Sequence, residues 1–244
     1  MSWNSHWTVQ AEAAKINAAQ DYRRRIIRAN LGINDHGHGA IIIDFGSGIG
    51  CQLVDLARAF PNAKFIGIDS SYVGLEIAAV RLPRGLYACQ DLSFGSKHRN
   101  SIRGLATHGV CSEVLEHVES PIDVLRNIRH FLTSEGTLVV TVPSGPISAF
   151  DVHIGHLRHY TQDSLRQLLL NAGFKNIIIK QYGFPFFDLY RLLVVVAGSR
   201  LINQYERPPS RMTRVLMALL RLSFKLNDLS VARGFQLLAI AQAG

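Results

Sequence analysis

One decapeptide constrains the fold of this 244-residue chain more than any other segment. It reads Ile41-Ile42-Ile43-Asp44-Phe45-Gly46-Ser47-Gly48-Ile49-Gly50, an apolar run that leads into glycines at alternate positions. Unbroken apolar residues are typical of a strand buried on both faces, and glycine lets the backbone turn sharply and approach a ligand closely. A helix over 51–60 follows, and its free N–H groups would face a polar or anionic ligand group. The segment therefore predicts a nucleotide-like cofactor site at the carboxyl end of a strand.

Strands and helices alternate along the rest of the chain. The expected strands are 40–44, 64–68, 85–90, 105–111, 137–142, 175–181 and 235–242, and the expected helices are 8–30, 51–60, 72–81, 120–132 and 161–173. This alternation predicts an α/β fold, a Rossmann-like seven-stranded, mostly parallel sheet with helices on both faces. We expect an N-terminal helical segment (1–39), a cofactor-binding core (40–183), a helical insertion or lid between the last two strands (184–233) and the final strand of the core (234–244).

Several protein classes are disfavoured by the same residues. A dinucleotide-binding turn needs glycine or alanine at position 51, where Cys51 stands, so a nicotinamide enzyme is disfavoured, and no phosphate-binding loop with its G-K-[ST] ending is present. The three cysteines are widely spaced and form no C-x-x-C pair, which argues against a disulfide or cysteine–zinc scaffold and indicates a reducing, cytoplasmic location. No run approaches the roughly 18 apolar residues of a membrane-spanning helix.

The positive charge is concentrated near the C-terminus. The formal net charge is +8, and residues 181–244 contain eight Arg or Lys against three Asp or Glu. Arg211, Arg214, Arg221 and Lys225 have the spacing of one face of an amphipathic helix. Such a helix can lie on an anionic membrane or hold a phosphorylated substrate, and a solvated face on a helix that covers the active site is the plainer interpretation.

Two acidic residues follow the second and third predicted strands. Asp69 comes nineteen residues after Gly50, where a carboxylate can accept two hydrogen bonds from a ribose diol. Asp91 follows the third strand and can meet the edge of a base. Capping of the next helix or turn is the alternative role for both carboxylates.

Together these residues resemble the class I S-adenosylmethionine (SAM)-dependent methyltransferases. The segment 44–50 looks like the first motif of that family, Asp69 like its ribose-binding acid, and Asp91-Leu92 like its adenine-contacting pair. Segments 111–118 and 155–161 are similar to the subgroup that contains the ubiquinone-biosynthesis O-methyltransferases, although the long link before the last strand departs from the family pattern. The resemblance implies SAM as cofactor, S-adenosylhomocysteine as product, and as cofactor-binding residues Asp44, Gly46, Ser47, Gly48, Gly50, Asp69, Ser70, Asp91, Leu92, Ser112 and Glu113.

An E-x-x-E-H segment, Glu113 to His117, carries the catalytic candidates His117 and Glu116. If the segment is helical, its two carboxylates and its imidazole share one face. His117 could be a general base that takes the proton of a hydroxyl acceptor, oriented by a carboxylate. A divalent metal is the second interpretation, and a purely structural role for the loop is the third. The metal-ligand candidates are Glu113, Glu116, His117 and His156, with His153 and His159 as alternatives to His156.

The sequence therefore favours a methyltransferase that acts on a small-molecule or lipid-linked acceptor, at oxygen rather than nitrogen. A metal-assisted RNA 2′-O-methyltransferase is the alternative, but nucleic acid is the less favoured partner because no RNA-binding module is present. A SAM-binding protein without catalysis is the third hypothesis. Peripheral membrane contact through the basic insertion would suit a lipid-linked acceptor.

Overall fold

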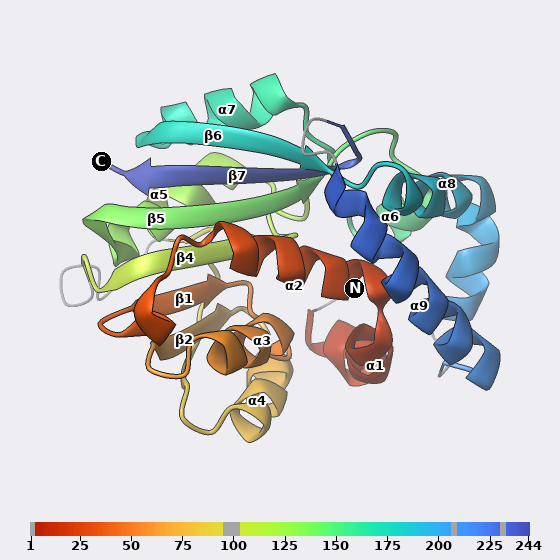
Figure 1. The fold of residues 1–244 in the computed structure, drawn as a ribbon, viewed down its shortest axis with the longest axis horizontal. Coiled ribbons are helices and arrows are strands. Elements are labelled where there is room, and N and C mark those ends of the chain that lie inside the picture. The colour runs from red at the N-terminus through yellow and green to blue at the C-terminus, as the bar shows by residue number, and fades with distance from the viewer. Residues whose placement is uncertain (1–2, 95–102, 206–208, 230–232) are drawn as a thin grey trace.

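The fold is built on one central sheet (Figure 1). The structure, a computed structural model, describes residues 3–94, 103–205, 209–229 and 233–244. The strands are β1 (Ile41–Phe45), β2 (Lys64–Asp69), β3 (Leu86–Cys89), β4 (Ala106–Ser112), β5 (Leu132–Pro143), β6 (Phe174–Tyr182) and β7 (Gln236–Ala243), in the order β3-β2-β1-β4-β5-β7-β6. All neighbours are parallel except β7, which runs antiparallel to both β5 and β6. The predicted seven-stranded, mostly parallel Rossmann-like sheet is confirmed.

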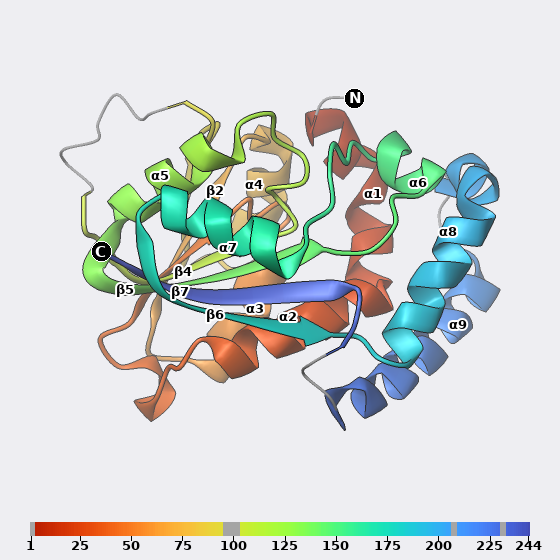
Figure 2. The same cartoon turned by 90° about the horizontal axis from the view of Figure 1, so that it is seen from above.

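Helices cover both faces of this sheet (Figure 2). On one face lie α2 (Ala18–Asn30) and α3 (Cys51–Ala59), and on the other lie α5 (Pro121–Phe131) and α7 (Gln162–Asn171); α4 (Tyr72–Arg81) follows β2. Neighbouring side chains of β1 enter the two resulting cores: Ile42 packs with the α2 and α3 side and Ile43 with the α5 and α7 side, and both are fully buried. Burial on both faces is the reason why β1 reads as an unbroken apolar run.

The prediction of a single N-terminal helix over 8–30 is wrong. The segment forms two helices, α1 (Trp3–Ile16) and α2, which meet at Asn17. Asn17 has an extended backbone, and its side-chain oxygen accepts hydrogen bonds from the backbone N–H groups of Ala19 and Gln20. An asparagine in this role starts a new helix, so the chain changes direction and α1 is free to lie over the carboxyl ends of the strands.

The segment between β6 and β7 is helical, as expected. It contains α8 (Phe186–Tyr205), α9 (Arg211–Ser223) and the 3-10 helix η3 (Phe224–Leu229), and Figures 1 and 2 show α8 and α9 together at one end of the molecule. Helix α6 (Ala149–His153) was not predicted from the sequence; it is a short helix with a capping box between Ser148 and Asp151, and it packs against α8. A further 3-10 turn, η1 (Asp35–Gly37), precedes β1. Within the described residues, no helix is long and apolar enough to cross a membrane.

Candidate active site

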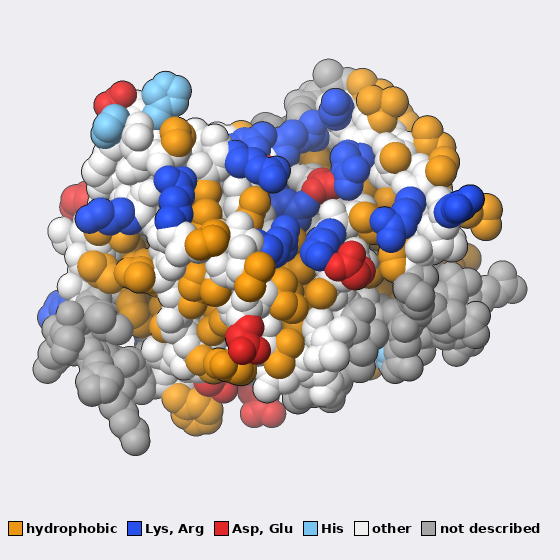
Figure 3. All heavy atoms as spheres, turned by 90° about the horizontal axis from the view of Figure 1, so that it is seen from below, with side chains coloured by type: hydrophobic (Ala, Val, Ile, Leu, Met, Phe, Trp, Pro, Cys, Tyr) orange, Lys and Arg blue, Asp and Glu red, His pale blue; other side chains and the backbone are white. Residues whose placement is uncertain are grey.

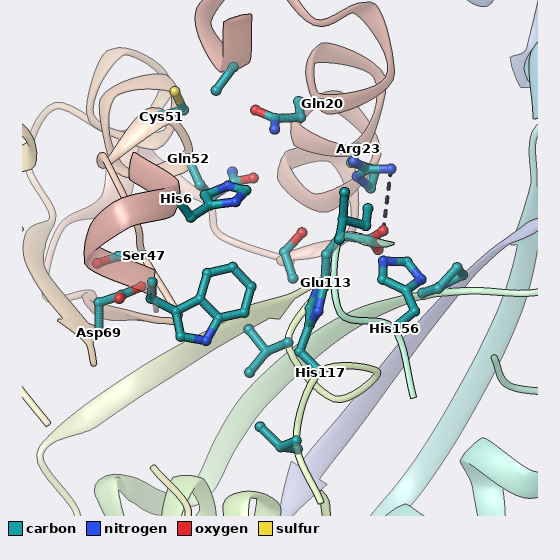
Figure 4. Close-up of a pocket in the computed structure, with 18 of the residues that line it drawn as sticks. His6, Gln20, Arg23, Ser47, Cys51, Gln52, Asp69, Glu113, His117 and His156 are labelled. Carbon is teal, nitrogen blue, oxygen red and sulfur yellow. Dashed lines mark ion pairs between the residues drawn. The ribbon is translucent and has the colours of Figure 1, made fainter. Parts of the chain in front are cut away.

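A cavity of about 820 Å³ lies at the carboxyl ends of the central strands (Figure 4). Open α/β sheets bind their ligands at this edge, and the volume is that of a small-molecule site. The sequence-predicted residues that line it are Asp44, Gly46, Ser47, Asp69, Ser70, Asp91, Leu92, Ser112, Glu113, His117 and His156. Gly48, Gly50 and Glu116 stand outside this lining. The far walls are formed by α1, α2 and α8.

The glycine turn requires glycine at each of its three positions. Gly46, Gly48 and Gly50 have positive φ angles of 78°, 50° and 72°, which side chains rarely tolerate. A Cβ atom on Gly46 would lie 2.3 Å from Cγ2 of Val114, and one on Gly48 would lie 2.3 Å from the indole of Trp7. The turn therefore allows two neighbouring segments to pack directly against its backbone.

Asp69 holds this turn to the start of α4. Its Oδ2 accepts a hydrogen bond of 2.7 Å from the backbone N–H of Gly48, and its Oδ1 accepts one of 2.7 Å from the N–H of Ser71. Burial raises the pKa of Asp69, and the two N–H donors act in the opposite direction. Since each carboxylate oxygen has two lone pairs, both can still accept a hydrogen bond from a ligand in the cavity.

The two residues after β3 differ in exposure. Asp91 is exposed, and its Oδ1 accepts a hydrogen bond of 2.8 Å from the backbone N–H of Ser93, so it caps the turn while it lines the cavity. Leu92 is buried, and its carbonyl accepts a hydrogen bond of 2.8 Å from Nδ2 of Asn127 on α5. One side chain is thus available to a ligand at a polar edge, and the other supplies an apolar surface.

Helix α1 supplies cavity residues that the sequence analysis missed, among them Trp3, His6, Trp7 and Gln10. Asn4 fastens the helix to α4, because its Oδ1 accepts a hydrogen bond of 2.8 Å from the Ser71 hydroxyl. Burial lowers the pKa of His6 to about 4, and the nearby His117 acts in the same direction. One sequence feature could have indicated this role: the two tryptophans of the chain stand four residues apart, about one helical turn, and so share a helix face.

The condition under which Glu113, Glu116 and His117 would share a helical face is not met, because the segment is a turn. Glu113 itself has a positive φ of 56°. Its carboxylate forms an ion pair with Arg23 on α2, drawn as a dashed line in Figure 4, with the two charged atoms 3.3 Å apart. It also accepts a hydrogen bond of 3.0 Å from Nε2 of Gln236 on β7. These two partners were not foreseen from the sequence, and they place Glu113 at the junction of three distant segments rather than in a group with the histidines.

Two residues of the cavity wall, His117 and His156, lie close to Glu116, which is buried behind them. Their carboxylate and imidazole ligand atoms all lie within 4.8 Å of one another. Glu116 is 0% exposed, and neither of its carboxylate oxygens has a hydrogen-bond partner among the described residues. Burial raises the pKa of Glu116 well above its ordinary value, and the Glu113 charge adds to this effect. Burial lowers the pKa of His117, which keeps its imidazole neutral at pH 7.

His156 also belongs to a neighbouring group with Asp151 and His159. The His156 Nδ1 and His159 Nε2 atoms are 3.0 Å apart. Asp151 accepts two hydrogen bonds of 3.1 Å from the guanidinium of Arg191 on α8, so its charge is already balanced. The third histidine, His153, is exposed on α6 and belongs to neither group. Glu116 with its unsatisfied oxygens is therefore the residue whose surroundings best suit a cation.

Solved structures of low sequence identity share this fold. One is a chain from the complex between the Haloferax volcanii Trm112 methyltransferase activator and a methyltransferase, with a TM-score of 0.67, 15% identity and coverage of 99% of this chain and 97% of that one. Another is the Haemonchus contortus phosphoethanolamine N-methyltransferase 2 in complex with SAM, with a TM-score of 0.63, 16% identity and coverage of 99% of this chain and 60% of that one. A third is the Streptomyces coelicolor A3(2) geranyl diphosphate C-methyltransferase, with a TM-score of 0.58, 14% identity and coverage of 92% of this chain and 76% of that one.

The second and third of these structures are named for transfer to nitrogen and to carbon, so the shared fold leaves the acceptor open. No curated protein matches the chain. The family-level match rests on sequence instead: the model of the family described as methyltransferase domain covers residues 16–178, from the end of α1 into β6. This stretch is more than half of the chain and contains the glycine turn, Asp69 and the E-x-x-E-H segment, and the chain therefore belongs to the methyltransferase-domain family.

Proposed function

We propose that this methyltransferase takes its methyl group from SAM and transfers it to a hydroxyl oxygen of a small-molecule or lipid-linked acceptor. One observation carries the proposal: a single cavity joins the glycine turn and Asp69 to His117. The residues suited to a cofactor and a group able to accept a proton thus face the same cavity, as a transfer between two bound molecules requires.

The residues of the cavity fit a polar cofactor such as SAM. Ser47 Oγ, Gln52 Nε2 and Gln90 Nε2 line the cavity, are buried, and have no hydrogen-bond partner among the described residues. Buried polar groups are rarely left unpaired, so these three atoms call for a ligand with donors and acceptors of its own. When bound, SAM supplies a methyl group already activated on a sulfonium sulfur. Asp69 is suited to hold the ribose hydroxyls, and Asp91 the edge of the base.

His117 is the residue that we propose as general base. Its neutral imidazole would take the proton of the hydroxyl group as the acceptor oxygen is methylated, and the imidazole would then carry a positive charge. We assign Glu116 to the positioning of this imidazole, because ligand atoms of the two side chains lie within 4.8 Å of each other. The alignment of acceptor, methyl carbon and sulfur in a dry cavity provides the remainder of the rate acceleration.

A divalent cation held by Glu116, His117 and His156 is the alternative means of activating the hydroxyl. The unsatisfied carboxylate oxygens of Glu116 are the observation that favours it. A carboxylate with two imidazoles is a ligand set used for Zn²⁺, Mn²⁺ and Fe²⁺. Such an ion, when bound, acts as a Lewis acid that makes a coordinated hydroxyl more acidic.

The cofactor assignment is tested by calorimetric titration with S-adenosylhomocysteine. We expect micromolar binding by the wild-type protein and a loss of at least about tenfold in Asp69→Asn, because a hydrogen bond to a charged acceptor is removed. Asp163→Ala, at an exposed carboxylate on α7, is the matched control and should bind like the wild type. Absence of binding by a folded wild-type protein contradicts the proposal.

The acceptor assignment is tested by a screen of hydroxyl-, amine- and carbon-acceptor compounds with labelled SAM. We expect transfer to hydroxyl compounds, and a fall of about 100-fold in kcat for His117→Asn with unchanged S-adenosylhomocysteine binding. Activity that disappears with a chelator and returns with Mn²⁺ or Zn²⁺ selects the cation over the free base. Transfer restricted to amine or carbon acceptors overturns the oxygen assignment.

A further inference from the structure

The outer face of α9 is apolar. Its exposed side chains include Met212, Val215, Leu216, Leu219 and Leu222, each between 52% and 81% exposed. These positions follow the three- and four-residue spacing of one helical stripe, and none of the thirteen residues of α9 is buried. We call these five side chains the α9 stripe. Figure 3, which shows the molecule from below, has hydrophobic side chains gathered at the end of the molecule where α9 lies, beside several Lys and Arg side chains.

The stripe is separate from the surface by which α9 is attached to the protein. Met217 and Leu220 point inward and pack against the core that α2 and the sheet share. Arg211 and Arg214 are exposed at one edge of the stripe, and exposed Lys225 and Leu226 follow in η3. The helix thus has an inner packing face, a basic edge and an outer apolar stripe, whereas an ordinary surface helix has a polar outer face.

Contiguous apolar side chains on a protein surface mark a site of interaction. In a two-fold contact between copies of this chain, the stripe would face itself and leave the basic edge formed by Arg211 and Arg214 without an anionic partner from the stripe of the other copy. An anionic lipid surface complements both components, since apolar side chains enter the acyl boundary while basic side chains meet the headgroups. The net positive charge of residues 181–244 also favours an anionic surface.

We propose that the α9 stripe docks this protein on the surface of an anionic bilayer, with Arg211 and Arg214 at the headgroup level. The docked helix lies at the same end of the molecule as α8 (Figures 1 and 2), whose Tyr190 and Arg191 line the cavity while its Leu193 and Val196 are exposed. The helices between β6 and β7 therefore connect the lipid surface to the cavity. A lipid-linked acceptor is then delivered from the bilayer, and this last step alone rests on the proposed function.

Vesicle co-sedimentation tests the docking directly. The vesicles contain either phosphatidylcholine alone or phosphatidylcholine with 30% phosphatidylglycerol, a composition chosen on the order of natural anionic leaflets. We expect the wild-type protein to sediment with the anionic vesicles, and more weakly as salt is raised. Leu216→Asp with Leu219→Asp should lower the affinity at least about tenfold, and Arg211→Glu with Arg214→Glu about 25-fold, from roughly fivefold per basic residue.

Val80→Asp is the matched control, because Val80 is 81% exposed on α4, in another part of the fold. It should sediment like the wild type, and all variants should keep their melting temperature and S-adenosylhomocysteine affinity. Wild-type protein that stays in solution with anionic vesicles overturns the proposal, as does sedimentation that the α9 variants leave unchanged. A dimer in solution that Leu216→Asp with Leu219→Asp separates assigns the stripe to self-association instead. Vesicle binding without S-adenosylhomocysteine binding overturns the proposed function and leaves the docking surface standing.

Discussion

The indole of Trp3 meets the imidazole of His117 edge to face, with ring centroids 4.9 Å apart and ring planes at 90°. His6 continues the contact to Trp7, with centroids 4.7 Å apart. The N-terminal helix therefore packs its aromatic side chains against the proposed general base on one side and the glycine turn on the other. Any ligand that fills the cavity must touch or displace this helix, and four consequences of the structure can be measured without knowledge of the acceptor.

The first prediction concerns tryptophan fluorescence. Both tryptophans of the chain line the cavity, so S-adenosylhomocysteine should change the emission of the protein with the same midpoint as the calorimetric titration. Trp7→Phe should remove most of the change, because the Trp7 ring lies directly over Gly48. Emission that stays constant at saturating ligand contradicts the placement of α1 over the cofactor site.

The second prediction concerns the glycine turn. Gly48→Ala should cost about 2–4 kcal/mol of unfolding free energy, because strain at positive φ adds to a clash with Trp7. Gly32→Ala is the matched control: Gly32 has a similar φ of 69°, but an added Cβ meets nothing within 4 Å, so its cost should be about 1 kcal/mol. Urea denaturation measures both, and Trp7→Ala should recover part of the Gly48→Ala loss. Equal losses of unfolding free energy at Gly48 and Gly32 would show that the Trp7 indole moves away from the added methyl group at little cost.

The third prediction concerns pH. Burial raises the pKa of Asp44 to about 8, and the charge of Asp69 acts in the same direction. A raised pKa means that the folded protein binds a proton that the unfolded chain has already lost, so this contribution to stability falls as pH rises from about 4 to 8. Asp44→Asn carries no such proton, so its stability relative to the wild type should rise between pH 5 and 8, by up to about 4 kcal/mol at roughly 1.4 kcal/mol per pH unit. Melting curves of both proteins, with Asp163→Asn as control, measure the difference. A constant difference across this range refutes the prediction.

The fourth prediction concerns the buried ion pair between Asp151 on α6 and Arg191 on α8. The two side chains are 1% and 14% exposed, so Arg191→Met should leave an unpaired buried carboxylate and cost about 3–5 kcal/mol. Addition of Asp151→Asn should restore part of that loss, since the uncompensated charge is gone. The exposed pair Arg126 and Asp123 is the comparison, and Arg126→Met should cost less than about 1 kcal/mol. If the stability losses of Arg191→Met and Asp151→Asn simply add in the double variant, the two side chains are not coupled and the prediction is wrong.

The sequence predicted the sheet well because its information is local. The apolar run of β1, the glycines after it and Asp69 at the end of β2 each lie within a few residues of the structure they specify. The helix boundaries of α4 and α7 follow from their cap residues, Ser71 and Thr161, for the same reason.

The remainder of the site depends on contacts between distant segments. Arg23, Glu113 and Gln236 meet from α2, the turn after β4, and β7, and no local pattern encodes that meeting. The break at Asn17 was missed because asparagine is tolerated within helices, and only the new direction of α1 shows that its side chain acts as a cap. The positive φ of Glu113 likewise converted an expected helical face into a turn. Whether His117, Glu116 and the cofactor-binding residues act as proposed stays a prediction.

Strand β7 is synthesised after every other strand, yet it lies between β5 and β6. During translation, β6 consequently has no neighbour in the sheet until the ribosome has passed the helices α8 and α9. The same late strand contributes Gln236, which bonds to Glu113 in the cavity wall. Until this last strand is in place, β6 lacks its neighbour in the sheet and Glu113 lacks its Gln236 partner, so the cavity wall is completed only when the final strand of the sheet is added.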